Sequence, residues 1–137
     1  MKKTKPHLYV VAAAIFNNNS VYCFKKGEHK FDYLSNRYEF PGGKIKDGES
    51  QRTALFREIR EELKVKIDVG EKIIEFDYEY PDFSLSMTGF KCEVKEANFC
   101  LTEHTEVLLI HEKELKQLEW LPADIPIVNK IFELADE

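Results

Sequence analysis

The chain has 137 residues, a length typical of one domain, and 43% of them are hydrophobic, which is enough for a folded core and excludes intrinsic disorder. No apolar run reaches the roughly 20 residues of a membrane span, so we expect no membrane partner. The mild net charge of -5 disfavours a nucleic-acid polymer, which selects a basic face, but it allows a free nucleotide whose phosphates bind through metal ions.

The first part of the chain predicts short strands. Residues 8–16 and 21–25 are β-rich runs joined by an Asn-rich turn, which indicates a hairpin. Residues 27–37 form a polar connection with one candidate strand. We expect the Pro-Gly-Gly of residues 41–43 to break regular structure.

Residues 50–64 form the clearest helix, because they lack Gly and Pro and are rich in helix formers. Ser50 or Asp47 is available to cap its N-terminus. The residues of its predicted core stripe share one face of the helical wheel: Leu55, Phe56, Ile59 and Leu63.

Strand-like stretches follow at residues 65–80, 84–94 and 106–111, the first two as antiparallel partners that turn at Pro81-Asp82. A second helix is expected from about residue 126 to 135, with one apolar face formed by Ile127, Ile131 and Leu134. Strands and helices out of strict alternation predict an α+β fold, an α/β/α sandwich in which a mixed sheet is flanked by two main helices. We expect residues 1–137 to form this single domain.

Three carboxylates, those of Glu58, Glu61 and Glu62, lie beside the apolar stripe of the first helix. Like charges at this spacing repel, and carboxylates beside an apolar wall lose hydration, so the cluster is costly unless a cation joins it. Hard oxygen ligands are those that Mg²⁺ selects. A solvated helix face with arginine and lysine partners is the competing interpretation of the helix taken alone.

The longer string that begins at Gly43 resembles the Nudix box, G-x5-E-x7-R-E-U-x-E-E-x-G-U, in which U is a bulky aliphatic residue. Eight of nine defined positions match: Gly43, Glu49, Arg57, Glu58, Ile59, Glu61, Glu62 and Val65. Lys64 stands where the pattern has Gly, which puts the turn after the helix in doubt but removes no candidate ligand. The flanking segments EFPGGK and LPADIP resemble the MutT branch of the family, which includes 8-oxo-dGTP and CTP pyrophosphohydrolases.

This resemblance implies a Mg²⁺-dependent hydrolase, with Mn²⁺ as a substitute, that cleaves a nucleoside triphosphate to the monophosphate and pyrophosphate. It implies that Glu58, Glu61 and Glu62 bind the metal and that the Gly43 carbonyl is a further ligand. Arg57 is expected to orient a glutamate of the box through a bidentate ion pair, and Glu49 to pair with it or approach the metal through water.

Family enzymes also use a carboxylate from outside the box, and Glu103 is the candidate because its segment resembles an E-H-x-E loop. We expect the next residue, His104, to be an ordinary exposed histidine. Phe40 and Asp124 are candidates for binding the base, together with strand aromatics such as Phe76, Tyr78 or Phe83. An ionised Asp124 accepts hydrogen bonds and so favours guanine or cytosine edges, although a helix N-cap is its competing role.

Lys25, with its neighbour Lys26, and Lys44 are candidate phosphate-binding residues, each as readily explained by solvation. Trp120 is expected in the core. The three cysteines have no disulfide or zinc spacing, which suggests a reducing cytoplasm. The chain is compatible with a monomer or a homodimer.

Two other functions stay open. One retains the box but acts on ADP-ribose, a dinucleotide polyphosphate or another nucleoside diphosphate derivative. The other is a non-catalytic nucleotide-binding module, which the intact REIREE segment argues against, because loss of catalysis would remove any requirement for the costly acids.

Overall fold

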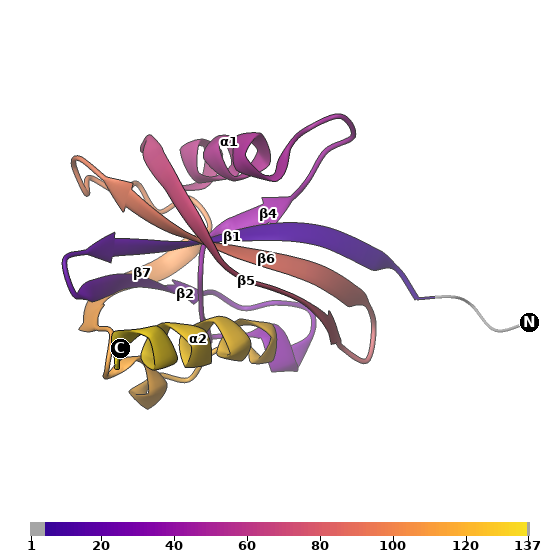
Figure 1. Ribbon diagram of the computed structural model, residues 1–137. Helices are drawn as coiled ribbons and strands as arrows, with labels where there is room; N and C mark the ends of the chain where they lie inside the picture. Colours follow the sequence, from indigo (N-terminus) through magenta and orange to yellow (C-terminus); the bar gives the residue numbers. More distant parts are fainter. Residues whose placement is uncertain (1–4, 137) are drawn as a thin grey trace, which may run out of the picture.

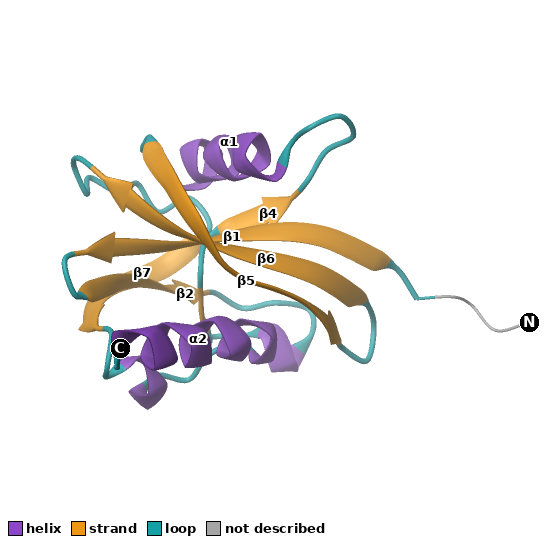
Figure 2. Cartoon of the chain, in the orientation of Figure 1, coloured by secondary structure: helices purple, strands orange, loops and turns teal. Residues whose placement is uncertain are grey.

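The computed structural model describes residues 5–136 and shows a mixed sheet between two helices. In Figures 1 and 2, α1 (Gln51–Leu63) lies on one face of the sheet and α2 (Ile125–Ala135) on the other. The strands are β1 His7–Asn17, β2 Ser20–Lys26, β3 Tyr38–Glu39, β4 Gly42–Lys44, β5 Ile67–Glu79, β6 Ser84–Val94 and β7 His104–His111. Short 3₁₀ helices lie at Asp32–Leu34, Leu115–Gln117 and Pro122–Asp124. The predicted α/β/α sandwich is confirmed.

The strand order is β3-β2-β1-β6-β5, with β4 paired to β1 and β7 paired to β2. Only the β1–β6 pair is parallel among these pairings, which makes the sheet mixed. The β1–β2 hairpin, in which Phe16 pairs with Val21, and the long antiparallel β5–β6 pair agree with the sequence predictions. Among the described helices, none is long and apolar enough to cross a bilayer.

The central strand β1 is apolar on both sides because each of its faces is covered by a helix. Val11, Ala13 and Ile15 belong to the core under α1, whereas Ala12, Ala14 and Phe16 belong to the core under α2. Side chains alternate between the faces of a strand, so one continuous apolar run supplies both cores. This run therefore fixes α1 and α2 on opposite sides of the same strand.

Helix α1 begins and ends as local sequence chemistry requires. Ser50 is the N-cap, and its hydroxyl accepts a hydrogen bond from the Thr53 amide at 3.1 Å. Lys64 adopts the left-handed conformation, φ 59° and ψ 32°, and its amide donates to the Arg60 carbonyl at 3.1 Å. The turn that the Nudix pattern assigns to Gly is therefore formed here by a lysine.

The apolar stripe of α1 differs at one position from the prediction. Leu55, Ile59 and Leu63 are fully buried, but Phe56 is 38% exposed and does not extend the stripe. Ala54 is buried in its place, because it lies on the sheet-facing side of the helix. Helix α2 shows a similar difference, since Leu134 is 43% exposed.

Two expectations about the segment before α1 need correction. Strand structure is interrupted at Phe40 and Pro41, as expected, but Gly42 and Gly43 already belong to β4, which pairs antiparallel with β1. Gly42 is required there because a Cβ would collide with the Val11 carbonyl. Residues 27–37 contain a 3₁₀ turn at Asp32–Leu34 and no strand.

Candidate functional site

Arg57 organises the loop that leads into α1. Its Nε and Nη2 atoms donate to the two carboxylate oxygens of Glu49 at 2.7 and 2.8 Å, and Nη2 also donates to the Lys44 carbonyl at 3.1 Å. This bidentate pair lowers the pKa of Glu49 to about 2, because the Arg57 hydrogen bonds stabilise the ionised carboxylate. The planar guanidinium thus connects β4 to the helix.

Glu58 lies between Arg57 and β4. Its Oε1 accepts from Arg57 Nη1 at 2.8 Å, and its carboxyl group packs against the backbone of Gly43. A Cβ on Gly43 would overlap the Glu58 carboxylate, so glycine is what allows the acid and the backbone to approach. Gly43 thus lies beside one of the box carboxylates, while its carbonyl as a metal ligand stays a prediction.

Glu62 is buried at the inner side of the cluster. Burial raises its pKa to about 9, and the charges of Glu103, Glu39 and Glu58 add to this effect, as does a hydrogen bond with Glu58. The Thr102 hydroxyl donates to the Glu62 carbonyl at 2.7 Å, which ties the loop before β7 to the helix. The charges of acids from three segments, β3, α1 and the loop before β7, therefore act on Glu62.

Glu61 and Glu103 lie at the solvent side of this cluster. The Glu61 side chain is 57% exposed and reaches Arg57 at 3.4 Å. Glu103 is exposed, and its charge acts on Glu62. The structure therefore brings Glu103 to the box, as the E-H-x-E resemblance predicts, although the residues are far apart in the sequence.

The donor set suits a hard divalent cation. In residues 5–136, no three acidic, histidine or cysteine side chains converge as a metal centre, and Arg57 binds both Glu49 and Glu58. However, burial and the charges of the nearby acids raise the pKa of Glu62, and a bound cation would offset both effects. Glu58, Glu62 and their acidic neighbours thus offer oxygen ligands and a charge that calls for compensation.

Sequence reasoning missed Glu39 and misjudged His104. His104 is buried, with 1% of its side chain exposed, and its Nε2 lies 2.8 Å from Glu39 Oε2, so the expectation of an exposed histidine was wrong. Lys26 Nζ lies 4.0 Å from the same oxygen. Both residues of this pair lie in motifs visible in the sequence, Glu39 in EFPGGK and His104 in E-H-x-E. The sequence does not show that they contact each other, because the contact forms only in the tertiary structure.

Asp124 is buried at the N-terminus of α2. Burial raises its pKa well above the usual range, the charge of Glu39 adds to the effect, and a hydrogen bond from the Phe40 backbone opposes it. Asp124 makes no side-chain cap bond to the helix, and its Oδ1 has no partner within residues 5–136. The N-cap explanation therefore fails, and an unpaired buried oxygen is available for a ligand.

The other predicted binding residues lie around these groups. The Phe40 ring is buried and stacks on Trp120 with centroids 4.6 Å apart, which confirms Trp120 as core and places Phe40 there too. Lys25 Nζ lies over the Tyr38 ring at 5.9 Å, and Lys44 is exposed. The strand aromatics Phe76, Tyr78 and Phe83 pack, half-buried, against the core under α2.

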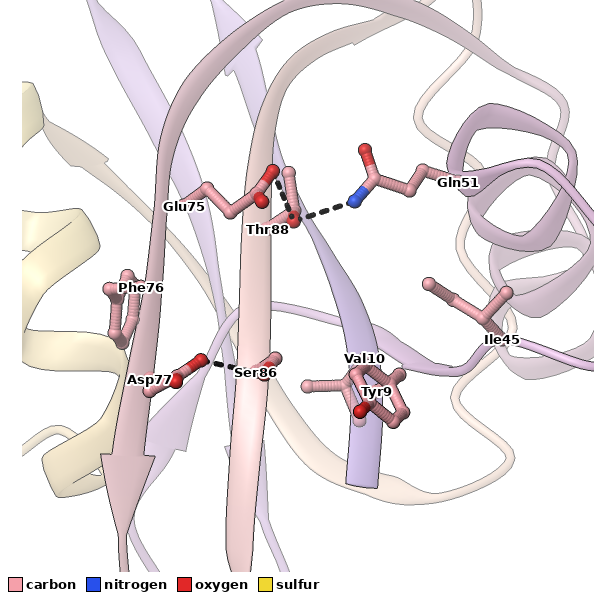
Figure 3. Close-up of a pocket in the computed structure, with 9 residues that line it drawn as sticks. All are labelled: Tyr9, Val10, Ile45, Gln51, Glu75, Phe76, Asp77, Ser86 and Thr88. Carbon is pink, nitrogen blue, oxygen red and sulfur yellow. Dashed lines mark hydrogen bonds between the residues drawn. The ribbon is translucent and has the colours of Figure 1, made fainter. Parts of the chain in front are cut away.

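A separate pocket of about 440 Å³ lies beside the N-terminus of α1 and contains none of these acids (Figure 3). Its polar side chains bind one another: Gln51 donates to Thr88 at 2.9 Å, and Ser86 donates to Asp77 at 2.6 Å. Because these bonds already satisfy the groups that line it, the pocket lacks the unpaired charge found around Glu62.

Comparison with known proteins agrees with the geometry. The NUDIX domain model matches residues 5–134. A CTP pyrophosphohydrolase of Escherichia coli is 32% identical over 97 residues, which cover 71% of this chain and 72% of that protein. An 8-oxo-dGTP diphosphatase of Escherichia coli is 30% identical over 124 residues, 90% and 96% of the respective chains.

Among solved structures, one similar protein is the DNA mismatch repair protein MutT, a Nudix hydrolase of methicillin-resistant Staphylococcus aureus. Its solution structure is 40% identical in sequence to this chain. It has a TM-score of 0.75 and covers 96% of this chain and 99% of that one. The family consists of hydrolases that act on acid anhydrides and generally use divalent metal ions. With Glu58 of the box packed beside Gly43 and the family model matched over residues 5–134, this chain belongs to the NUDIX family, in the MutT-like branch.

Proposed function

We propose that this protein is a Mg²⁺-dependent nucleoside triphosphate pyrophosphohydrolase that releases the nucleoside monophosphate and pyrophosphate. The observation that carries the proposal is the buried Glu62, whose pKa is raised to about 9 by burial and by the charges of nearby acids. A buried acid cluster without a cation is costly, and a metal bound to polyphosphate removes that cost. The names of the relatives place CTP and 8-oxo-dGTP first among the nucleotides to test.

The positions of the residues suggest a separate role for each in metal binding and orientation. Glu58 and Glu62, with the Gly43 carbonyl and the more exposed Glu61, would hold Mg²⁺, or Mn²⁺ in its place. The metal supplies charge neutralisation and an acidified water when bound. The planar guanidinium of Arg57 keeps Glu49 and Glu58 oriented through several N–H donors, an arrangement that the single ammonium group of lysine cannot reproduce.

Glu103 is the proposed general base, because it reaches the cluster from a loop and lies on its solvent side. Proton removal from the attacking water would let its oxygen form a bond to the α- or β-phosphorus. The bond from that phosphorus to the oxygen bridging the α- and β-phosphates would break, so that the monophosphate and pyrophosphate separate. Lys25 and Lys44 are the proposed contacts to the outer phosphates. Cytoplasmic location is part of the proposal, in line with the free thiols of all three cysteines.

Base recognition is assigned to the region of Asp124 and Phe40. The unpaired Asp124 Oδ1 is a buried polar atom beside the core under α2, and it would supply one polar contact to a base bound there. Guanine and cytosine both present N–H groups that a carboxylate accepts.

The test is product release from each candidate substrate, with Mg²⁺ and with EDTA. The products are pyrophosphate from CTP, dCTP, dGTP and 8-oxo-dGTP, AMP from ADP-ribose, and a mononucleotide from a dinucleotide polyphosphate. We expect metal-dependent release from a triphosphate, and a loss of about 100-fold in kcat for Glu62→Gln. Glu114→Gln, a change of an exposed acid outside the site, is the matched control and should behave as the wild type. Release from no member of the panel would leave the non-catalytic binding module, and preference for ADP-ribose would reassign the substrate.

A further inference from the structure

His104 is an imidazole enclosed by the protein at the edge of the proposed site. Its side chain is 1% exposed, and its ring packs against Phe24 with centroids 5.4 Å apart. Burial of an imidazole is unfavourable unless its ring nitrogens regain hydrogen bonds, since both nitrogens lose their contacts with water. One nitrogen recovers a hydrogen bond, that of Nε2 to Glu39 at 2.8 Å.

The hydrogen-bond pattern identifies the tautomer. An ionised carboxylate only accepts, so Nε2 must carry the proton that bridges to Glu39. The other nitrogen, Nδ1, is buried and has no partner within the described part of the chain. A bare acceptor in that position costs less than a buried N–H without an acceptor, which favours the same tautomer.

The backbone aims the two side chains at each other. Glu39 lies on β3, which pairs with one edge of β2 through Phe24, and His104 begins β7, which pairs with the other edge through Lys26. The register of β2 with β7 shifts between Lys25 and Lys26, next to His104. Such irregularities redirect side chains near functional sites, and here the shift accompanies a bond that crosses β2.

Glu39 stands between the two halves of the proposed site. Its charge acts on Glu62 in the acid cluster and on Asp124 at the base-binding end. The carboxylate has a competing partner in Lys26, whose Nζ is 4.0 Å away on the side of the surface. Without a fixed donor, the Glu39 side chain is free to turn toward that lysine.

We propose that His104 is a positioning residue, which fixes the Glu39 carboxylate so that it accepts a hydrogen bond from a hydroxyl or N–H group of the bound nucleoside. This inference rests on the proposed function, because a nucleotide with its phosphates at Glu62 and its base at Asp124 passes Glu39. The role needs the Nε2 donor and not the aromatic ring itself. Comparison of CTP with dCTP identifies whether the donor on the ligand is the 2′-hydroxyl of the sugar.

Two substitutions of equal length separate the donor from the packing. In His104→Gln, the amide nitrogen lies the same number of bonds from Cβ as Nε2 and can donate to Glu39, whereas His104→Met fills the same space without a donor. We expect His104→Met to lower kcat/KM for the preferred nucleotide by about tenfold or more, as loss of a hydrogen bond to a charged group does, and His104→Gln to restore most of it. His111→Met, at the exposed end of β7, is the control and should leave kcat/KM unchanged.

A double-mutant cycle tests whether His104 acts through Glu39. In the Glu39→Gln background, His104→Met should cause little further loss of kcat/KM, because the carboxylate that it orients is already gone. Equal losses for Gln and Met, or additive losses in the cycle, would show a packing role and overturn the proposal. Thermal unfolding of every variant separates lower activity from lower folded content.

Two measurements are independent of turnover. The ¹⁵N shifts of the His104 ring should report a proton on Nε2, and a proton on Nδ1 would contradict the inference. Binding of a nucleoside monophosphate, followed by NMR titration, should weaken about tenfold in His104→Met but not in His104→Gln. If no variant hydrolyses any nucleotide while these results hold, the proposed function fails and the positioning role survives.

Discussion

Two glutamates of the same box have opposite electrostatic environments. Glu49 accepts two hydrogen bonds from Arg57, and its pKa falls to about 2, whereas burial among like charges raises the pKa of Glu62 to about 9. Opposed shifts of this kind mark acids with different tasks. Glu49 stays ionised to hold the loop, and Glu62 stays protonated until a cation compensates it.

The Glu62 shift predicts how stability depends on pH in EDTA. The folded-state pKa of about 9 exceeds the ordinary value of 4.5, so the folded state binds more protons than the unfolded state between these values. The free energy of unfolding should therefore fall as pH rises from about 5 to 9, by at most about 1.4 kcal/mol per pH unit from this group. Glu62→Gln should remove this contribution, measured by urea unfolding at several pH values.

Glu61→Gln is the matched control, because its side chain is 57% exposed and should leave the pH profile as in the wild type. If Glu62→Gln and the wild type lose stability in parallel across this range, Glu62 is ionised in the metal-free fold and the proposed role of the cation loses its basis.

At the scale of elements, α1 depends on its two ends. Ser50 caps the first turn as the sequence indicates, and Lys64 occupies the left-handed position for which the family pattern has Gly. A side chain at positive φ is strained, because its Cβ crowds the following carbonyl oxygen. The helix forms despite this strain. Glu58 still packs against Gly43 of β4, and Glu62 is buried beside it.

Relief of that strain is a prediction for stability. Lys64→Gly should raise the free energy of unfolding by about 0.5 kcal/mol, because the removed strain exceeds the added entropy of the unfolded chain. Lys64→Ala retains a Cβ and should give no gain. Differential scanning calorimetry of the three proteins checks the order, and a glycine variant less stable than the alanine variant would contradict it.

At the scale of the molecule, the sheet gathers acids from distant segments. Glu39 lies on β3, Glu58 and Glu62 lie on α1, Glu103 precedes β7, and Asp124 is the N-cap residue of α2. Helices α1 and α2 cover opposite faces of β1, so these acids come from both sides of the sheet. Binding at the cluster should therefore stabilise the whole fold, since only the folded chain assembles it.

We expect a saturating concentration of Mg²⁺ to raise Tm by about 9 °C relative to EDTA, as binding at about a hundred times Kd does for a domain of this size. The double variant Glu58→Gln, Glu62→Gln should show no such rise. Differential scanning fluorimetry measures both, with Na⁺ at matched ionic strength as the control. A rise in Tm that persists in the double variant would show that the cation binds at another site.

The sequence by itself determined the helix of the Nudix box, its Ser50 cap, the β1–β2 hairpin and the β5–β6 pair, because these depend on contacts between near neighbours in the chain. It also identified the box acids and Glu103, since fixed spacing on a helix and a local motif carry that information. The number of domains stays a prediction.

Only the tertiary structure decided the partners of these groups. It placed Gly42 and Gly43 in a strand, exposed Phe56, buried His104 against Glu39 and left Asp124 with an unpaired oxygen. Each outcome depends on which distant segment packs over the residue. That segment determines the residue's burial, its pKa and its hydrogen bonds. Local sequence does not encode them, because the neighbours that create them are brought together only when the two cores close on β1.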